Sequence, residues 1–306
     1  MNRDDRVQLM LETMRAGWQP NGEGVAAERS AFEGVAKLFP EPTGVVEEDV
    51  RLGGVPAIRT MPAGGLDDNA PTILYLHGGA FLIGSARIYR EQSARLSRAA
   101  GARVVTLDYR LAPEHPFPAA LDDTVAAYLD LLAHGVDAWM VVIAGDSAGG
   151  NLALAAAMRL RDGRHPLPAG LALISPWVDL TCAGASMQAN ANPRHLAQRA
   201  GLLASASTYL QGQDAGNPLE SPLTGDLSDL PPILIQVGSL ETLLDDSLML
   251  ERRAAADGTR TRLQIFDGMV HEWHLLSALL PAETSLDEAR EAVDEIGRFV
   301  RESTAG

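Results

Sequence analysis

Apolar residues recur at helical spacing in the first part of the chain. Their separation of three or four positions puts them on one face of a helix, so the stretch up to about residue 38 is expected to be helical. Pro40 and Pro42 then interrupt this pattern. The apolar positions are Val7, Met10, Leu11 and Met14, with Trp18 one turn later.

Short apolar runs that are typical of strands follow. They lie at residues 44–52, 55–60, 72–77, 102–107, 140–144, 171–175, 233–237 and 261–266. The later runs are apolar on both faces, like the strands of a buried parallel sheet. Helical segments are expected between and after them, at residues 121–134, 148–161 and about 285–302. This alternation predicts an α/β fold, with a mostly parallel central sheet flanked by helices.

Residues 179–232 interrupt the alternation. They contain helical pieces but no clear strand, and a connection of that length is usually functional or has structure of its own. We interpret it as an insertion over the carboxyl edge of the sheet, facing the N-terminal helices. We therefore expect a single domain, residues 1–306, with a helical cap formed by about 1–38 and about 180–222.

Composition and charge narrow the class of protein. The 306 residues carry a net charge of -15, which argues against nucleic acid and anionic membranes as partners. The one cysteine, Cys182, allows neither an intrachain disulfide nor a cysteine metal cluster. No run approaches the ~20 apolar residues of a membrane span, and no signal peptide is recognisable. We expect a cytoplasmic protein without stable membrane insertion.

The segment GDSAGG, residues 145–150, contains the pattern Gly-x-Ser-x-Gly around Ser147. It directly follows the apolar run 140–144 and directly precedes a helical run. A strand, a sharp turn and a helix in this order present a serine hydroxyl as a nucleophile. We therefore predict that Ser147 is the nucleophile and that its side chain is exposed at the turn.

A second glycine-rich segment, HGGAF at residues 77–81, follows the strand expected at 72–77. Glycine lets the backbone come close to a ligand, because it has no Cβ. Backbone N–H groups held in this way stabilise the oxyanion of a tetrahedral intermediate. We expect the amides of Gly78, Gly79 and Ala148 to form this oxyanion hole.

A serine nucleophile needs a base, and the base needs a carboxylate that orients it. With a Gly-x-Ser-x-Gly turn, the order along the chain is serine, acid, histidine. His271 lies in the loop after the strand at 261–266, and we assign it as the base. His274 is one helical turn further on and is expected to point away. A metal site at His271, Glu272 and His274 is not expected, because the HExxH spacing is absent.

The acid is expected just after the strand at 233–237, in the segment VGSLETLLDDS. Glu241 lies on the expected loop and is our assignment. Asp245 and Asp246 are the alternatives. They fall at the start of the next helix, where acidic side chains complement the helix dipole.

Together these segments resemble the hormone-sensitive lipase-like bacterial esterases, also called family IV, of the α/β-hydrolase fold. The resemblance covers nearly the whole chain beyond the N-terminal helices. It rests on HGGAF, on DYRLAPEHPFPAALDD at 108–123, on GDSAGG, on SPWVDLT at 175–181, on VGSLETLLDD and on the loop of His271. It implies a cap above the site, no cofactor and no metal, and ester substrates with short to medium acyl chains.

This chain departs from the family at two positions. Glu241 stands where an aspartate is common, which keeps the carboxylate chemistry. Ala80 stands where a glycine is frequent, and we do not expect its amide to be a donor. In the loop 109–118, fixed by prolines, we expect Asp108, Arg110 and Glu114 to form a buried ion-pair network.

The predicted function is hydrolysis of a small-molecule carboxylic ester through an acyl-enzyme intermediate. A lactone or acetyl-group hydrolase with the same triad remains an alternative, because specificity depends on side chains of the cap. A non-catalytic small-molecule receptor is less expected, since receptors that resemble this family have lost the catalytic histidine and His271 is present. Residues expected to contribute to the substrate pocket are Met14, Trp18, Leu202, Leu203 and Tyr209.

The strand at 261–266 is the last in the sequence and is expected at an edge of the sheet. An edge strand has unpaired backbone groups that can pair with another chain. Only Arg260 and Arg262 protect this one, so we expect a homodimer that pairs the strand with its own copy. The alternative is a monomer in which these arginines and the C-terminal helix cover the edge.

Overall fold

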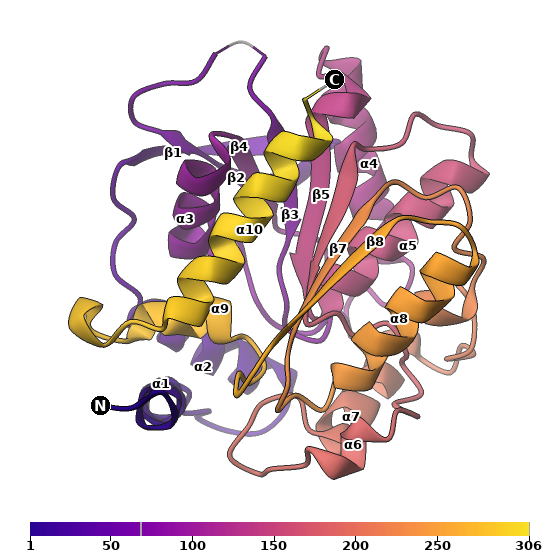
Figure 1. Cartoon of the computed structure of the whole chain (residues 1–306). Helices are drawn as coiled ribbons and strands as arrows, with labels where there is room; N and C mark the ends of the chain where they lie inside the picture. Colours follow the sequence, from indigo (N-terminus) through magenta and orange to yellow (C-terminus); the bar gives the residue numbers. More distant parts are fainter. Residues whose placement is uncertain (68, 306) are drawn as a thin grey trace.

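The computed structural model describes residues 1–67 and 69–305 and contains an eight-stranded sheet in the order β1-β2-β4-β3-β5-β6-β7-β8 (Figure 1). The strands are β1 (Val45–Leu52), β2 (Val55–Pro62), β3 (Thr72–Leu76), β4 (Arg103–Leu107), β5 (Val141–Asp146), β6 (Gly170–Ile174), β7 (Ile233–Gly238) and β8 (Thr261–Phe266). β2 is antiparallel to β1 and β4, and the other neighbours are parallel. The prediction of a mostly parallel sheet is confirmed.

The helices are α1 (Arg3–Gly17), α2 (Val25–Ala36), α3 (Arg90–Ala100), α4 (Ala119–Ala133), α5 (Ala148–Asp162), α6 (Ser186–Ala189), α7 (Arg199–Leu210), α8 (Leu244–Ala256), α9 (Trp273–Leu276) and α10 (Asp287–Ser303). Short 3-10 turns lie at 138–140, 222–224, 277–279 and 282–284. In the described part of the chain no helix has the length and apolar character needed to cross a membrane.

Helices cover both faces of the sheet (Figure 1). α4, α5 and α8 pack on one face, and α3 and α10 pack together on the other. Leu74 and Leu76 of β3 belong to the core on the α5 side, whereas Ile73 and Tyr75 belong to the core on the α10 side. All four side chains are fully buried, which explains the continuous apolar runs in the sequence.

The N-terminal stretch forms two helices. α1 ends at Gly17, and α2 begins at Val25 after a turn. The indole of Trp18 packs against Phe32 with ring centroids 4.7 Å apart and donates to Glu28 at 2.7 Å. These contacts hold α2 against α1.

The long insertion at 179–232 contains α6 and α7 and, as predicted, no strand among its described residues. In Figure 1, α1, α2, α6 and α7 gather at one end of the sheet, at the bottom of the view. Met14 of α1 and Leu202 of α7 line the same small pocket. The two segments therefore meet over one end of the sheet.

α3 was not predicted. Its sequence, REQSARLSRAA, has one large apolar residue, Leu96. The buried side of the helix includes Gln92, Ser93 and Ser97. Small and polar side chains let α3 pack closely, so its buried face has no apolar period to detect.

The ion-pair network expected in loop 109–118 does not form, because its members turn to other partners. Arg110 pairs with Asp123 on α4, and Asp108 accepts the backbone N–H of Ala86 at 2.6 Å. The exposed carboxylate of Glu114 bonds to Arg29 of α2 at 2.7 Å. The loop is thereby tied to the N-terminal helices.

β8 lies at the edge of the sheet, as predicted. Arg262 pairs with Glu302 of α10 at 3.0 Å. Ile265, in contrast, is 48% exposed. The edge is therefore protected at one position and open at another.

Candidate active site

Ser147 occupies a sharp turn between β5 and α5. Its backbone has φ 53° and ψ -117°, a sparsely populated conformation that costs about 1–3 kcal/mol for a residue other than glycine. A Cβ at Gly149 would lie 1.9 Å from the carbonyl oxygen of Leu76, so only glycine fits there. These features bring α5 close to the sheet and set the direction of the serine side chain.

The expected exposure of Ser147 is wrong. Only 4% of the residue is exposed, because side chains of α1, α2 and α7 lie above it and form a pocket. The nucleophile is reached through this pocket rather than directly from solvent.

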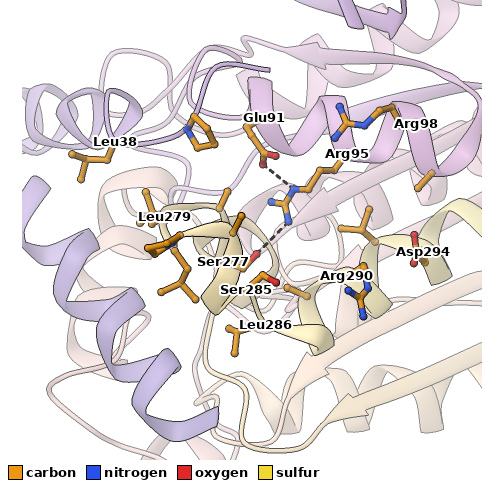
Figure 2. Close-up of a pocket in the computed structure, with 18 residues that line it drawn as sticks. Leu38, Glu91, Arg95, Arg98, Ser277, Leu279, Ser285, Leu286, Arg290 and Asp294 are labelled. Carbon is orange, nitrogen blue, oxygen red and sulfur yellow. Dashed lines mark hydrogen bonds and ion pairs between the residues drawn. The ribbon is translucent and has the colours of Figure 1, made fainter. Parts of the chain in front are cut away.

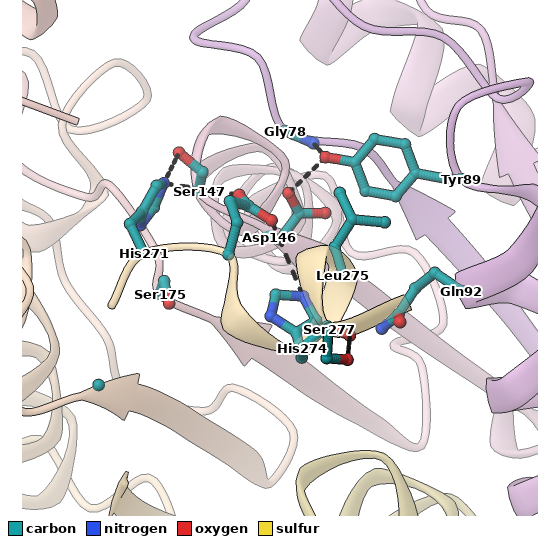
Figure 3. Close-up of polar contacts among 12 residues, drawn as sticks. Gly78, Tyr89, Gln92, Asp146, Ser147, Ser175, His271, His274, Leu275 and Ser277 are labelled. Atoms are coloured by element: carbon teal, nitrogen blue, oxygen red, sulfur yellow. Dashed lines mark hydrogen bonds and ion pairs between the residues drawn. The ribbon is translucent and has the colours of Figure 1, made fainter. Parts of the chain in front are cut away.

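His271 contacts both Ser147 and Glu241, and Figure 3 shows its ring beside Ser147. Its Nε2 is 3.1 Å from Oγ of Ser147, and its Nδ1 is 2.7 Å from Oε2 of Glu241. With the carboxylate accepting from Nδ1–H, Nε2 is free to accept the serine hydroxyl proton. The three side chains therefore have the arrangement of a nucleophile, a base and an orienting acid.

The second oxygen of Glu241 is also held in place. Oε1 accepts the backbone N–H of Gly238 at 2.6 Å and the hydroxyl of Ser175 at 2.7 Å. Glu241 is 2% exposed. A carboxylate with several donors stays in one orientation, so it can fix the ring of His271.

The two alternative carboxylates lie elsewhere and brace the insertion. Oδ2 of Asp245 accepts the N–H of Ser186 at 2.9 Å. Oδ2 of Asp246 accepts the N–H groups of Val178 and Asp179 at 2.9 and 3.0 Å. Burial raises the pKa of Asp246 to about 8.

The loop after β3 differs from the expectation at Gly78. Its N–H donates to the hydroxyl of Tyr89 at 3.0 Å, so this amide is not free for an oxyanion. A Cβ at Gly78 would lie 2.2 Å from Oδ2 of Asp146. Glycine is therefore required there by the neighbouring carboxylate. Gly79 and Ala80, by contrast, line the pocket beside Ser147.

Ser147 lies at the base of a pocket of about 130 Å³ with mostly apolar walls. Of the predicted substrate-contacting residues, Met14, Trp18 and Leu202 line it. Leu203 packs against the core on the α5 side, and Tyr209 stacks on Phe81 with centroids 3.9 Å apart, so neither faces the pocket. The lining residues that sequence reasoning missed are Phe32, Ile83, Tyr89, Leu196, Ala197, Glu272, Leu275 and Leu276.

A wider groove of about 570 Å³ adjoins this pocket. It runs between α2 and α7 and is lined by Val25 and Glu28 on one side and Ser205 and Thr208 on the other. Trp18, Gly79, Ala80, Ile83, Ala197 and Leu202 line both spaces. The groove is thus continuous with the space above Ser147.

Another hollow, of about 940 Å³, lies elsewhere, between α3, α10 and residues 277–286 (Figure 2). This hollow is not lined by Ser147, Glu241 or His271, all of which the structure describes. Arg95 forms its inner wall, pairing with Glu91 at 2.8 Å and donating to Ser277 at 3.2 Å. Among the residues described, no group of three or more histidine, cysteine or acidic side chains is placed to hold a metal ion.

The chain is similar to known proteins over nearly its whole length. A family model described as the α/β hydrolase fold matches residues 73–275. The acetyl-hydrolase of Streptomyces hygroscopicus is 42% identical over 97% of each chain. An esterase of Acinetobacter venetianus is 35% identical over 89% of this chain and 88% of its own. The crystal structure of a bacterial hormone-sensitive lipase family esterase matches with TM-score 0.92 and 39% identity, covering 99% of this chain and 100% of that one.

Proposed function

Because this chain belongs to the α/β-hydrolase fold family, and within it to the bacterial hormone-sensitive lipase group of esterases, we propose that it is a serine carboxylesterase. The observation that carries the proposal is the position of His271, 3.1 Å from Oγ of Ser147 and 2.7 Å from Oε2 of Glu241. In this function Ser147 is the nucleophile, His271 the base and Glu241 the orienting acid.

Hydrolysis takes place in two halves. Oγ of Ser147 attacks the ester carbonyl carbon while Nε2 of His271 accepts the serine proton, and the imidazolium then gives that proton to the departing alcohol. Water attacks the resulting acyl-enzyme while His271 accepts its proton. The histidine returns this proton to Ser147 as the carboxylic acid leaves. Glu241 balances the charge of the imidazolium in both halves.

The oxyanion hole in this proposal consists of the amides of Gly79, Ala80 and Ala148. Gly79 and Ala80 border the space at Ser147. Ala148 is the first residue of α5, where an amide has no partner within the helix. Gly78 is replaced by Ala80 in this set, because the Gly78 N–H is bonded to Tyr89. Each such donor is typically worth ~10²–10³ in rate.

The proposed substrates are esters with short acyl chains. The pocket at Ser147 has about 130 Å³, well below the roughly 300–1,000 Å³ of pockets that enclose drug-sized ligands. A small acyl group fits this space, and the alcohol part would extend into the groove between α2 and α7. The acetyl-hydrolase relative makes an acetyl ester the favoured candidate.

Two alternatives have less support. A lactone hydrolase would use the same three side chains, and no described contact favours a cyclic ester over a linear one. A non-catalytic receptor would not need a histidine 3.1 Å from Oγ of the serine. The contact between His271 and Ser147 therefore favours an enzyme.

The test is turnover of p-nitrophenyl esters of increasing acyl length by the purified protein. Acetyl and butyryl esters are expected to give the highest kcat/KM, and Ser147→Ala is expected to abolish turnover while leaving the fold intact. Ser207→Ala, at an exposed serine of α7, is the matched control and should keep full activity. Turnover by Ser147→Ala above a few per cent of wild type would disprove the assignment.

Assembly and location complete the proposal. A two-fold dimer through β8 is supported by the position of this strand at the sheet edge and by the exposure of Ile265. A cytoplasmic location is supported by the single cysteine, which is buried. Cell fractionation would test the location, and the dimer is taken up among the predictions below.

A further inference from the structure

The residue after the proposed base, Glu272, is buried beside it. Oε1 of Glu272 lies 3.5 Å from Nε2 of His271, the nitrogen that contacts Ser147. Glu272 is 7% exposed, and its backbone is left-handed with φ 65°. This conformation turns the carboxyl back into the site. An ionised carboxylate at this distance would favour the protonated form of His271, which cannot accept the serine proton.

The carboxyls of Glu272 and Asp146 approach the same point beside Gly78, where a Cβ would lie 3.0 Å from Oε1 of Glu272 and 2.2 Å from Oδ2 of Asp146. Asp146 is fully buried and accepts the hydroxyls of Tyr75 at 2.7 Å and Tyr89 at 2.8 Å. Figure 3 shows Ser147 and His271 on one side of Asp146 and Tyr89 on the other. Two buried carboxyls that face each other at close range favour holding one proton between them, because two adjacent negative charges repel each other.

The phenol contacts decide which carboxyl holds the proton. Two hydroxyl donors stabilise a negative charge on Asp146. Glu272 has no such donors, and in the described part of the chain its Oε2 has no hydrogen-bond partner at all. This difference in donors favours the proton on Glu272.

Neither His274 nor Arg95 supplies a cation to Glu272. His274 of α9 has Nε2 3.9 Å from Oε2 of Glu272. Burial, with Arg95 and His271 nearby, holds the pKa of His274 well below its usual value, so this ring is neutral. Arg95 is turned toward Glu91 and the carbonyl oxygen of His274. The titratable or charged groups facing the pair are Tyr75, His77, Tyr89, Arg95, Glu241, His271 and His274.

Burial and the neighbouring Asp146 raise the pKa of Glu272 well above its usual value. Burial also raises the pKa of Tyr75 and Tyr89, so both phenols keep their protons and remain donors. These directions agree with the assignment made from the burial and the phenol contacts.

We propose that Glu272 is held as a neutral carboxylic acid that donates its proton to Asp146, and that this shared proton keeps a second negative charge away from Nε2 of His271. His271 then stays free to accept the proton of Ser147. Tyr89, which donates to Asp146, also accepts the N–H of Gly78, so the hydrogen-bonded chain reaches the loop after β3. Glu272 is thus a positioning residue, and the proposal rests on the proposed esterase function.

The test compares two variants that differ only in hydrogen bonding. Glu272→Gln keeps a neutral donor of the same shape, so kcat/KM is expected to stay within about threefold of wild type. Glu272→Met keeps the length but has no donor, and loss of a hydrogen bond to a buried charge is expected to lower kcat/KM by about tenfold or more. The matched controls are Glu220→Gln and Glu220→Met, at another buried glutamate away from Ser147. Both substitutions should leave kcat/KM close to the wild-type value.

The acid limb of the pH profile supplies a readout that a merely structural role would not move. Glu272→Gln should leave the pH of half-maximal kcat/KM unchanged, because no charge is removed. If Glu272 were ionised, the substitution would shift this limb to lower pH by about one unit or more. Such a shift would overturn the proposal, as would a glutamine variant as impaired as the methionine variant or a methionine variant as active as wild type.

Infrared spectroscopy tests the protonation directly and needs no turnover. At a pH where exposed carboxyls are ionised, the wild type is expected to show a protonated carboxyl band that Glu272→Gln removes and Glu220→Gln does not. A difference spectrum without this band would refute the shared proton. If the wild type hydrolyses no ester, the proposed function fails, and the infrared result still decides the state of Glu272.

Discussion

The hydroxyl of Tyr89 lies 3.0 Å from the backbone nitrogen of Gly78 and accepts its N–H, while it donates to Asp146 at 2.8 Å. Tyr89 therefore fixes the loop after β3 from outside the loop. Because its N–H is bonded to Tyr89, Gly78 does not contribute to the proposed oxyanion hole. The residues that follow Gly78 supply the donors instead.

Tyr89→Phe should lower kcat more than it changes KM. Without the hydroxyl, the N–H of Gly78 loses its acceptor and the loop can move away from the transition state, whereas substrate binding depends on the apolar pocket. A fall in kcat of about tenfold is expected, similar to the loss of one buried hydrogen bond. Steady-state kinetics would measure it. Tyr128→Phe, on α4 and bonded to Pro166, is the control, and an equal effect there would point to general destabilisation.

Glu241→Gln should reduce kcat by several orders of magnitude. The amide keeps the shape but cannot balance an imidazolium, and in known triads this change costs ~10⁴. Asp245→Asn, at a carboxylate that contacts Ser186 instead, should stay near wild type. The assignment of the acid would be wrong if the two variants exchanged these results.

Leu202→Ala should move the acyl preference toward longer chains. Leu202 lines both the pocket and the groove, so truncating it enlarges the space above Ser147. The adjacent Leu203 packs toward the core and makes a close control. A panel of p-nitrophenyl esters would measure both variants. If Leu203→Ala shifted the profile as much as Leu202→Ala, the shift could not be assigned to the pocket.

Asp246→Asn should stabilise the protein increasingly as pH rises. The folded pKa of Asp246 is raised to about 8, chiefly by burial, whereas an unfolded aspartate has a pKa of about 3.9. The folded chain binds the Asp246 proton more tightly than the unfolded chain does. The stabilisation of the fold by this proton is therefore fully present below about pH 4 and is lost as pH rises to about 8. An asparagine carries no such dependence.

Urea unfolding at an acidic and an alkaline pH would measure this effect. The gain in free energy of unfolding from Asp246→Asn should be larger at alkaline pH by more than about 1 kcal/mol, since one pKa unit corresponds to about 1.4 kcal/mol. An equal effect at both values would show that Asp246 is ionised when folded. Asp245→Asn, on the same turn of α8, is the reference.

Purified protein should be a dimer that Ile265→Asp converts to a monomer. Ile265 is 48% exposed on the edge strand, and an added charge would oppose pairing of this strand with its copy. Light scattering would distinguish the two states, since one chain has a mass of 32.5 kDa. A wild-type protein with the mass of one chain would end the dimer proposal.

Much of the fold and of the site is predictable because its residues leave a local pattern. The strands are apolar on both faces, and the nucleophile, base and acid each follow a strand in a fixed order. In contrast, α3 buries Gln92 and Ser93, and a buried polar face has no apolar period. The burial of Ser147 depends on helices far away in the sequence, so no local pattern predicts it.

The role of the loop residues and of Glu272 also depends on distant contacts. Gly78 and Gly79 look alike in the sequence, but Tyr89 reaches only the amide of Gly78. The sequence indicates no role for Glu272, because its spacing fits no metal motif. The role proposed for it depends on Asp146, which is more than a hundred positions earlier. Leu202 and Leu203 are likewise adjacent and identical, and they differ only in the direction in which each side chain points from α7.

The contacts of Arg29 have a consequence for how substrate enters. Its guanidinium bonds to the carbonyl oxygens of Leu82 and Ala112 at 2.6 Å each and to both carboxylate oxygens of Glu114. α2 is therefore bonded to the loop after β3 and to the loop 109–118, and it cannot lift off as a hinged flap without breaking these bonds. If α2 stays in place, the groove beside α7 is the route to Ser147, and the width of that passage would limit the size of the alcohol part of the proposed ester.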